Sequence, residues 1–176
     1  MWTWTAAWLV ASAEVRGIGD GWVPLATFAT IAAGGVGAWL AGRSADRTGR
    51  TRVAGLSLAV SGSCAVITPL LFGAAPLVVV PIFLLWGFAV VADSAQFSTM
   101  VTEVADSEYR GTALTLQTAL GFLLTLLTIR GVPLLADAWG WRWAFPLLAL
   151  GPAAGIAAMV ALRRSTFAAA LAGGRG

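Results

Sequence analysis

The densest cluster of charged residues in the sequence lies between Gly42 and Arg52, which read GRSADRTGRTR. Arginine side chains form strong paired hydrogen bonds with carboxylates, and a carboxylate such as Asp46 can also dock at a helix N-terminus. Gly49 allows a sharp backbone turn within the cluster. Ion pairs of this kind can hold one arrangement of helices and break when another forms. The sequence therefore predicts a conformational latch, formed by Gly42, Asp46, Arg47, Gly49, Arg50 and Arg52, with Asp93, Glu103, Asp106 and Glu108 as candidate partners.

Polar side chains inside the long apolar stretches form a second set of candidates, because such groups are costly within a membrane. Asp93 can carry a proton, bind a substrate or pair with Arg47 or Arg50, and we favour the structural pairing. Arg130 is interpreted first as a side chain that extends to the lipid headgroups, with capture of an anionic substrate as the alternative. The hydroxyls and amides can line a path or bond a neighbouring helix. The candidate substrate-path residues are Gln96, Thr115, Gln117, Thr118, Trp86 and Arg130.

The residue types that most enzymes and metal sites need are scarce. The sequence has no His, its 11 basic residues are all Arg, and Cys64 is its only cysteine. We find no nucleophile with an adjacent base, no phosphate-binding glycine loop and no paired catalytic carboxylates. We therefore expect no enzymatic activity, no metal and no cofactor, with proton coupling left open.

The overall composition is that of a membrane protein. Of the 176 residues, 59% are hydrophobic and 11% are charged, and the mean hydropathy is +0.84. A soluble domain carries about a quarter of its residues as charged side chains. The net charge of +3 does not indicate nucleic acid as a partner, because the arginines flank apolar stretches as topology signals do. Membrane lipids are the expected surroundings.

Charge-free stretches define the elements that would position these residues. About 20 apolar residues cross a bilayer as a helix, and the longest stretch, from Val53 to Ala92, is twice that length and is broken by the turn PLLFGAAP. The predicted fold is an all-α transmembrane bundle with five full spans and a truncated first one. The expected helices cover about residues 1–13, 22–42, 53–72, 76–97, 111–132 and 143–162, followed by a tail at 163–176.

The apolar segment at residues 1–13 is only about half as long as a membrane span. A signal peptide is one interpretation, but a positively charged start is absent and three tryptophans crowd the segment. A helix lying on the membrane surface is disfavoured because the segment has no charged face. We favour the outer half of a sixth helix whose first half is missing from this chain.

The arginines also predict the orientation in the membrane. Alternating spans place one group of arginines on one side, and the positive-inside rule makes that side cytoplasmic. The C-terminus is therefore expected in the cytoplasm, and the Arg-rich, Lys-free composition suggests a bacterial cytoplasmic (inner) membrane. The predicted cytoplasmic group is Arg43, Arg47, Arg50, Arg52, Arg110, Arg163, Arg164 and Arg175.

The stretch from Gly42 to Arg52 resembles a loop signature of the major facilitator superfamily, written G-x-x-x-D-(R/K)-x-G-R-(R/K). Thr51 departs from the signature, and Arg52 stands one position later than the usual second basic residue. The stretches 90–103, 111–125 and 140–155 are also similar to segments of that superfamily. The signature residues present in this sequence are Gly42, Asp46, Arg47, Gly49 and Arg50.

This resemblance implies a transporter that moves a small solute by alternating access between two six-helix halves. The short tail after the last span favours the C-terminal half of such a protein. The complementary wall would then come from an N-terminal half or from a second chain.

Two alternatives remain open. The chain can instead be a non-transporting membrane scaffold that binds another membrane protein through small-residue faces, such as the stripe Gly34, Ala38 and Gly42. The arginines can also serve orientation alone, without any latch.

Overall fold

The computed structural model describes residues 1–173 of the chain. Helices make up 87% of it, and no strand occurs in this described part. The α-helices are α1 (Trp2–Arg16), α2 (Val23–Thr48), α3 (Arg50–Leu71), α4 (Pro76–Val104), α5 (Arg110–Trp139) and α6 (Leu150–Arg163). Short 3₁₀ helices cover η1 (Trp141–Trp143), η2 (Pro146–Ala149) and η3 (Thr166–Gly173).

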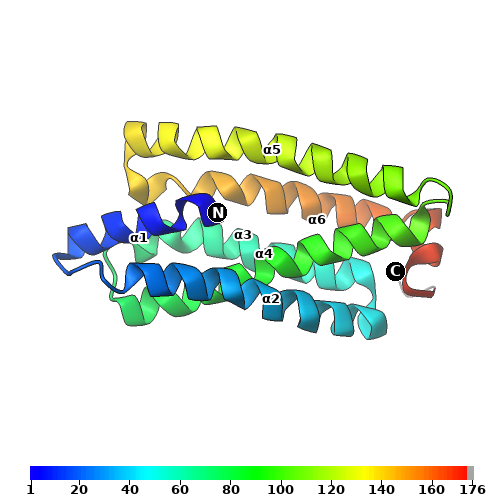
Figure 1. Cartoon of the computed structure of the whole chain (residues 1–176), viewed down its shortest axis with the longest axis horizontal. Helices are drawn as coiled ribbons and strands as arrows, with labels where there is room; N and C mark the ends of the chain where they lie inside the picture. The colour runs from blue at the N-terminus through cyan, green and yellow to red at the C-terminus, as the bar shows by residue number, and fades with distance from the viewer. Residues whose placement is uncertain (174–176) are drawn as a thin grey trace.

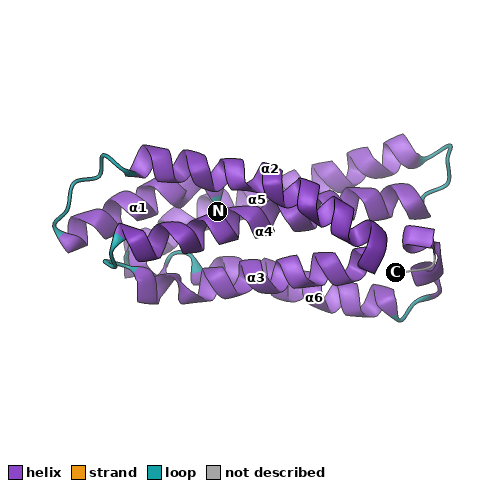
Figure 2. Cartoon of the chain, turned by 90° about the horizontal axis from the view of Figure 1, so that it is seen from below, coloured by secondary structure: helices purple, strands orange, loops and turns teal. Residues whose placement is uncertain are grey.

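The long helices lie side by side along one axis, as Figure 1 shows. By length and composition, five segments can cross a membrane: α2, α3, α4, α5 and the segment from Trp141 to Arg163 that contains α6. Loops are short and lie near the two ends of the bundle (Figure 2). The predicted all-α bundle with five long apolar spans and a shorter first helix is confirmed.

The shorter helix α1 begins near the middle of the bundle and runs to the end where α2 begins (Figure 1). It stops at Gly17, whose φ of 73° is a left-handed conformation that glycine adopts without strain. The amides of Gly17 and Ile18 donate to the carbonyls of Glu14 and Ala13, which closes the helix. α1 therefore extends three residues beyond the predicted limit at residue 13.

The connections alternate between the two ends of the bundle. The α2–α3 turn, the α4–α5 loop and the end of α6 lie together at one end (Figure 1), which we call the arginine end. It carries Arg43, Arg47, Arg50, Arg52, Arg110, Arg163 and Arg164. The arrangement follows the predicted alternation of the arginines, whereas Arg175 and the rest of 174–176 lie outside the described residues.

Several helix ends differ from the sequence prediction. Residues 43–52, expected to form a loop, are helical on both sides of Gly49. Charged side chains at the ends of a transmembrane helix extend into the headgroup region, so backbone hydrogen bonding continues past the apolar stretch. The last span is interrupted instead: η1 and η2 precede α6, because Pro146 at the start of η2 cannot continue an α-helix from the preceding turn.

The closest helix crossing joins α2 to α4. A Cβ added at Gly37 would overlap the backbone carbonyl of Phe88, and one at Gly87 would overlap the carbonyl of Thr30. Gly34 likewise faces Val91, whereas a Cβ at Gly42 would meet open space. Of the predicted stripe Gly34, Ala38 and Gly42, Gly34 therefore lies at this crossing and Gly42 does not. Gly37 lies three residues after Gly34 on the same face of α2, and both glycines are buried.

An aromatic cluster fills the core between α1, α4 and the start of the last span. Trp8 and Phe83 are fully buried, and their ring centroids lie 5.1 Å apart. Trp86 and Phe145 pack edge to face at 5.5 Å. The cluster fixes α1 against α4, because large aromatic rings contribute much apolar contact and prefer such tilted pairs. By contrast, α5 exposes most of its apolar side chains, as lipid-facing helices do.

Candidate functional site

Arg50 connects three helices at the arginine end. It is the first residue of α3, and its Nη2 lies 2.8 Å from Asp46 Oδ1 of α2. The same guanidinium donates through Nη2 and Nε to Glu103 Oε1 of α4, at 3.0 and 3.1 Å. The side chains of Arg50 and Glu103 are only 12% and 24% exposed, so water screens this pair less than an ordinary surface ion pair.

Gly49 places Arg50 in this position. Its φ of 103° and ψ of 142° break the helix for a single residue, so that α3 can turn back beside α2. The Gly49 amide donates to the carbonyl of Ala45 at 3.0 Å, which satisfies the last turn of α2. A side chain is strained at this φ, so the glycine is required by geometry.

The structure brings together only part of the predicted latch. Asp46, Gly49, Arg50 and Glu103 meet, but within residues 1–173 no ion pair joins Arg47 or Arg52 to an acid. Gly42 lies inside α2 without a special conformation. Asp106 and Glu108 belong to the loop after α4 and make no ion pair with a described arginine. They lie beyond the end of the helix whose last turns face Arg50.

Asp93 does not pair with Arg47 or Arg50, contrary to the structural role we favoured from the sequence. It precedes Glu103 by ten residues, which is about 15 Å along α4. Asp93 is 8% exposed, and its Oδ1 accepts a hydrogen bond from Ser94 Oγ at 2.9 Å. The carboxyl lines a cavity of about 350 Å³ between α3, α4 and α6.

Trp86 lies in a wall of the same cavity and is buried. Its indole Nε1 donates to Ser61 Oγ of α3 at 3.1 Å, which fixes the orientation of the ring. Met1, marked N near the middle of the bundle in Figure 1, lines the cavity as well. The predicted substrate-path residue Trp86 and the acid Asp93 are therefore brought together at mid-length of the bundle.

The other predicted path residues are dispersed. Gln96 is 1% exposed in α4, and its Oε1 has no hydrogen-bond partner among the described residues. In α5, Thr115 and Thr118 are exposed and Gln117 is half-buried. Arg130 is exposed and forms no ion pair within the described part of the chain. The residues of α5 do not reach the cavity beside Asp93.

Three residues that the sequence reasoning missed hold the opposite end of the bundle together. Ser12 Oγ accepts from the Gly73 amide at 2.9 Å, and Arg16 donates to the Gly73 carbonyl at 3.1 Å. Arg142 Nε donates to the carbonyl of Pro69 at 3.0 Å. The last carbonyls of a helix lack partners within it, so a basic side chain placed there satisfies one of them. These contacts join residues that are 57, 61 and 73 positions apart, so no local sequence pattern indicated them.

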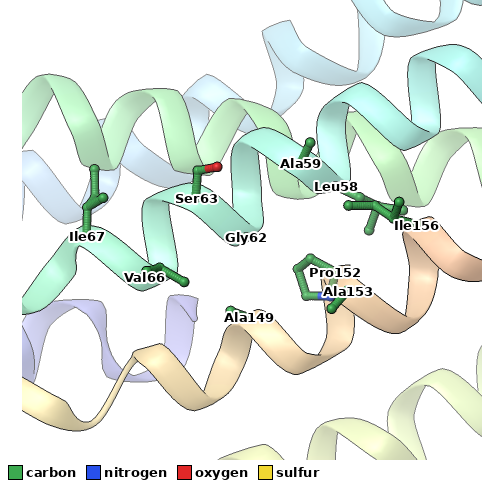
Figure 3. A pocket seen from close by; sticks show the side chains of 10 residues that line it. All are labelled: Leu58, Ala59, Gly62, Ser63, Val66, Ile67, Ala149, Pro152, Ala153 and Ile156. Carbon is green, nitrogen blue, oxygen red and sulfur yellow. The ribbon is translucent and has the colours of Figure 1, made fainter.

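A second, larger cavity of about 460 Å³ lies between α3 and α6 (Figure 3). Its walls come from Leu58 to Ile67 on α3 and from η2 and α6 on the other side, and none of its lining side chains is charged. Within residues 1–173, no group of three or more His, Cys, Asp or Glu side chains could hold a metal ion. The charged chemistry of the described bundle interior is therefore concentrated at Arg50 and at Asp93.

The fold and these sites indicate a multi-pass membrane protein, since five helices are long and apolar enough to span a bilayer. Comparison with protein-family models, with curated proteins and with solved structures finds no match to this chain. The resemblance to the major facilitator superfamily therefore has only the sequence motifs in its support.

Proposed function

We propose that the chain is a six-helix unit of a secondary transporter of the major facilitator type, which moves a small solute by alternating access. The observation that carries the proposal is the ion-paired contact of Arg50 with Asp46 and Glu103, at the segment that resembles the family signature. This contact ties α2, α3 and α4 at one end of the bundle. Ion pairs that must break for helices to move are a common device of two-state proteins.

The proposed orientation places the arginine end and the C-terminus in the cytoplasm, in a bacterial cytoplasmic membrane. Seven of the described arginines gather at that end, as the positive-inside rule requires of a cytoplasmic face. The wall opposite this unit would be supplied by a second six-helix half, on the same chain or on another. Proton coupling is compatible with the buried acid Asp93, and no bound cofactor is part of the proposal.

In the transport cycle, the contact at Arg50 holds the cytoplasmic ends of α2, α3 and α4 together in one state. Opening of that end separates Glu103 from Arg50, while the pair with Asp46 moves as one piece because both residues flank Gly49. The tight α2–α4 crossing at Gly37 and Gly87 supplies the pivot, since backbones in contact resist sliding but permit small rotations. The latch thus biases the equilibrium between two helix arrangements.

A membrane scaffold is the second candidate, and the exposed face of α5 favours it. Leu116, Leu120, Leu123 and Leu127 of α5 are all exposed in the isolated chain. A scaffold would bury such a face against another membrane protein and would need no moving latch. The two functions therefore differ in whether breaking the Arg50 contact changes access to the interior.

The test measures access to the cavity from each side of the membrane. Cys64 is replaced by alanine and Gly151→Cys serves as the reporter, because Gly151 lines the Asp93 cavity and a Cβ there meets open space. A membrane-impermeant maleimide labels the reporter in vesicles of known orientation. Glu103→Gln removes the charge from the latch, and Glu108→Gln is the matched control, since Glu108 pairs with no described arginine.

A transporter predicts that Glu103→Gln changes the ratio of labelling rates from the two sides about fivefold, because a partly buried ion pair contributes about 1 kcal/mol to one state. Glu108→Gln should leave the ratio as in the parent. Equal ratios in all three proteins would contradict alternating access and would favour the scaffold.

A further inference from the structure

The carboxyl of Asp93 lies on the wall of a cavity inside the bundle, between α3, α4 and α6. It lies in α4, well within the segment that can span the membrane, and only 8% of its surface is exposed. Burial of a charge in such a place is expensive unless a counter-charge is present or arrives. Asp93 is therefore the strongest candidate for a binding group.

No described basic side chain neutralises this carboxyl. The ion pairs among residues 1–173 all involve Arg50, which is about three turns further along the bundle. Ser94 hydrogen-bonds the carboxyl, and its hydroxyl donates to Oδ1 at 2.9 Å. Met1 brings the first amino group of the chain to the same cavity, but it makes no ion pair with Asp93 in the described structure. The carboxyl therefore has hydrogen bonds from Ser94 but no cationic partner among the described residues.

The remaining walls are apolar and aromatic. Trp86 and Phe97 come from α4, Leu58 and Ser61 from α3, and the glycine and proline backbone of α6 closes the other side. The Trp86 ring is held by its bond to Ser61 and by edge-to-face contacts with Phe83 and Phe145. It is thus a rigid wall beside a negative charge.

These walls fit one class of ligand. Aromatic faces attract cations, and an ammonium group can pair with the carboxylate while its apolar part contacts the aliphatic wall. An anion would be repelled by Asp93. Divalent metal ions require six or more oxygen ligands for Ca²⁺ or near-ideal octahedral coordination for Mg²⁺, which one carboxylate and two serines do not supply. A volume of about 350 Å³ accommodates a small organic molecule.

We propose that the cavity between α3, α4 and α6 binds a small organic ammonium ion, with Asp93 as its counter-charge and Trp86 and Phe97 as its aromatic walls. This inference rests on the proposed transport function, for which it names the class of substrate.

The test uses the purified full chain in lipid nanodiscs and benzyltrimethylammonium as the probe, since its charge does not titrate. Binding is measured by equilibrium dialysis of the radiolabelled probe, with empty nanodiscs subtracted. Neopentylbenzene, which has the same shape without the charge, is the competing neutral compound. Asp93→Asn removes the counter-charge at equal size, and Asp137→Asn is the matched control at an exposed acid of α5.

The expected result is saturable binding that weakens about tenfold or more in Asp93→Asn, is unchanged in Asp137→Asn and resists competition by neopentylbenzene. Absence of saturable binding, equal affinity in Asp93→Asn, or displacement by the neutral compound would overturn the proposal.

A second variant keeps the proposal testable if Asp93→Asn does not fold. Gly151→Leu places a side chain into the open space of the cavity without changing any charge, and Gly121→Leu is its control at an open position on α5. We expect about fivefold weaker binding in Gly151→Leu only. Equal affinities in the two leucine variants would show that the probe binds elsewhere.

Binding and transport can fail separately. Saturable, Asp93-dependent binding without a change of sided labelling in Glu103→Gln would support the cation site and contradict the transporter. A change of sided labelling without probe binding would support the transporter and overturn the cation site.

Discussion

The α2–α4 crossing can be tested by adding a single methyl group at Gly37. In Gly37→Ala the new Cβ would overlap the carbonyl oxygen of Phe88 and lie only 2.9 Å from its carbonyl carbon. Carbon atoms in good contact are about 3.5–4.0 Å apart. The obstacle is backbone, which no rotamer change can move, so the two helices must separate. Gly35→Ala is the matched control, because a Cβ at Gly35, on the exposed side of the same helix, meets nothing within 4 Å.

The comparison isolates the cost of the overlap. Replacing glycine by alanine inside a helix changes its intrinsic propensity by about 1 kcal/mol, and this gain is common to both variants. Overpacking a tight contact costs about 1–3 kcal/mol. Since the contact at Gly37 is with backbone, we expect the upper part of that range. Gly37→Ala should therefore be about 2–3 kcal/mol less stable than Gly35→Ala.

The assay is unfolding of the purified full chain in mixed micelles with increasing fractions of SDS, followed by circular dichroism. The transition of Gly37→Ala should occur at a lower SDS fraction than that of Gly35→Ala. Gly87→Ala should be destabilised in the same way as Gly37→Ala, because its new Cβ would overlap the Thr30 carbonyl. Equal or greater stability of Gly37→Ala relative to Gly35→Ala would refute the close approach of the two helices.

Two further substitutions test the turns and caps. Gly49→Ala should lower stability by about 1–3 kcal/mol in the same assay, because alanine is strained at a φ of 103°. Gly42→Ala is the control and should not lower stability, because a Cβ at this position in α2 meets open space. Equal effects of the two substitutions would contradict the turn geometry. Arg142→Met should cost about 1 kcal/mol, because it removes the donor to the Pro69 carbonyl. Arg130→Met, at an exposed position without an ion pair in the described structure, should stay within about 0.5 kcal/mol of the parent. Unchanged stability of Arg142→Met would contradict the capping role.

The sequence by itself determined the class of fold and the order of the spans. Hydrophobicity over about 20 residues decides whether a helix can cross a bilayer, and this is a property of each stretch alone. The turn between Pro69 and Pro76 separates α3 from α4, as its Gly and Pro content predicted. The gathering of arginines at one end followed from counting spans. The sequence also supplied the residue types of the latch and the buried acid.

Tertiary structure decided which faces and which charges meet. Gly37 faces α4 and Gly42 does not, because each residue turns the helix by about 100° and the contacting side is fixed only by the partner helix. Hydrophobicity does not determine which face of a helix contacts a neighbouring helix within a bilayer, because the lipid tails are as apolar as leucine. Likewise Arg50 pairs with Glu103 and leaves Asp93 to a cavity, since the length of α4 sets the distance between the two acids. Such pairings depend on contacts between residues far apart in the chain, which local patterns do not contain.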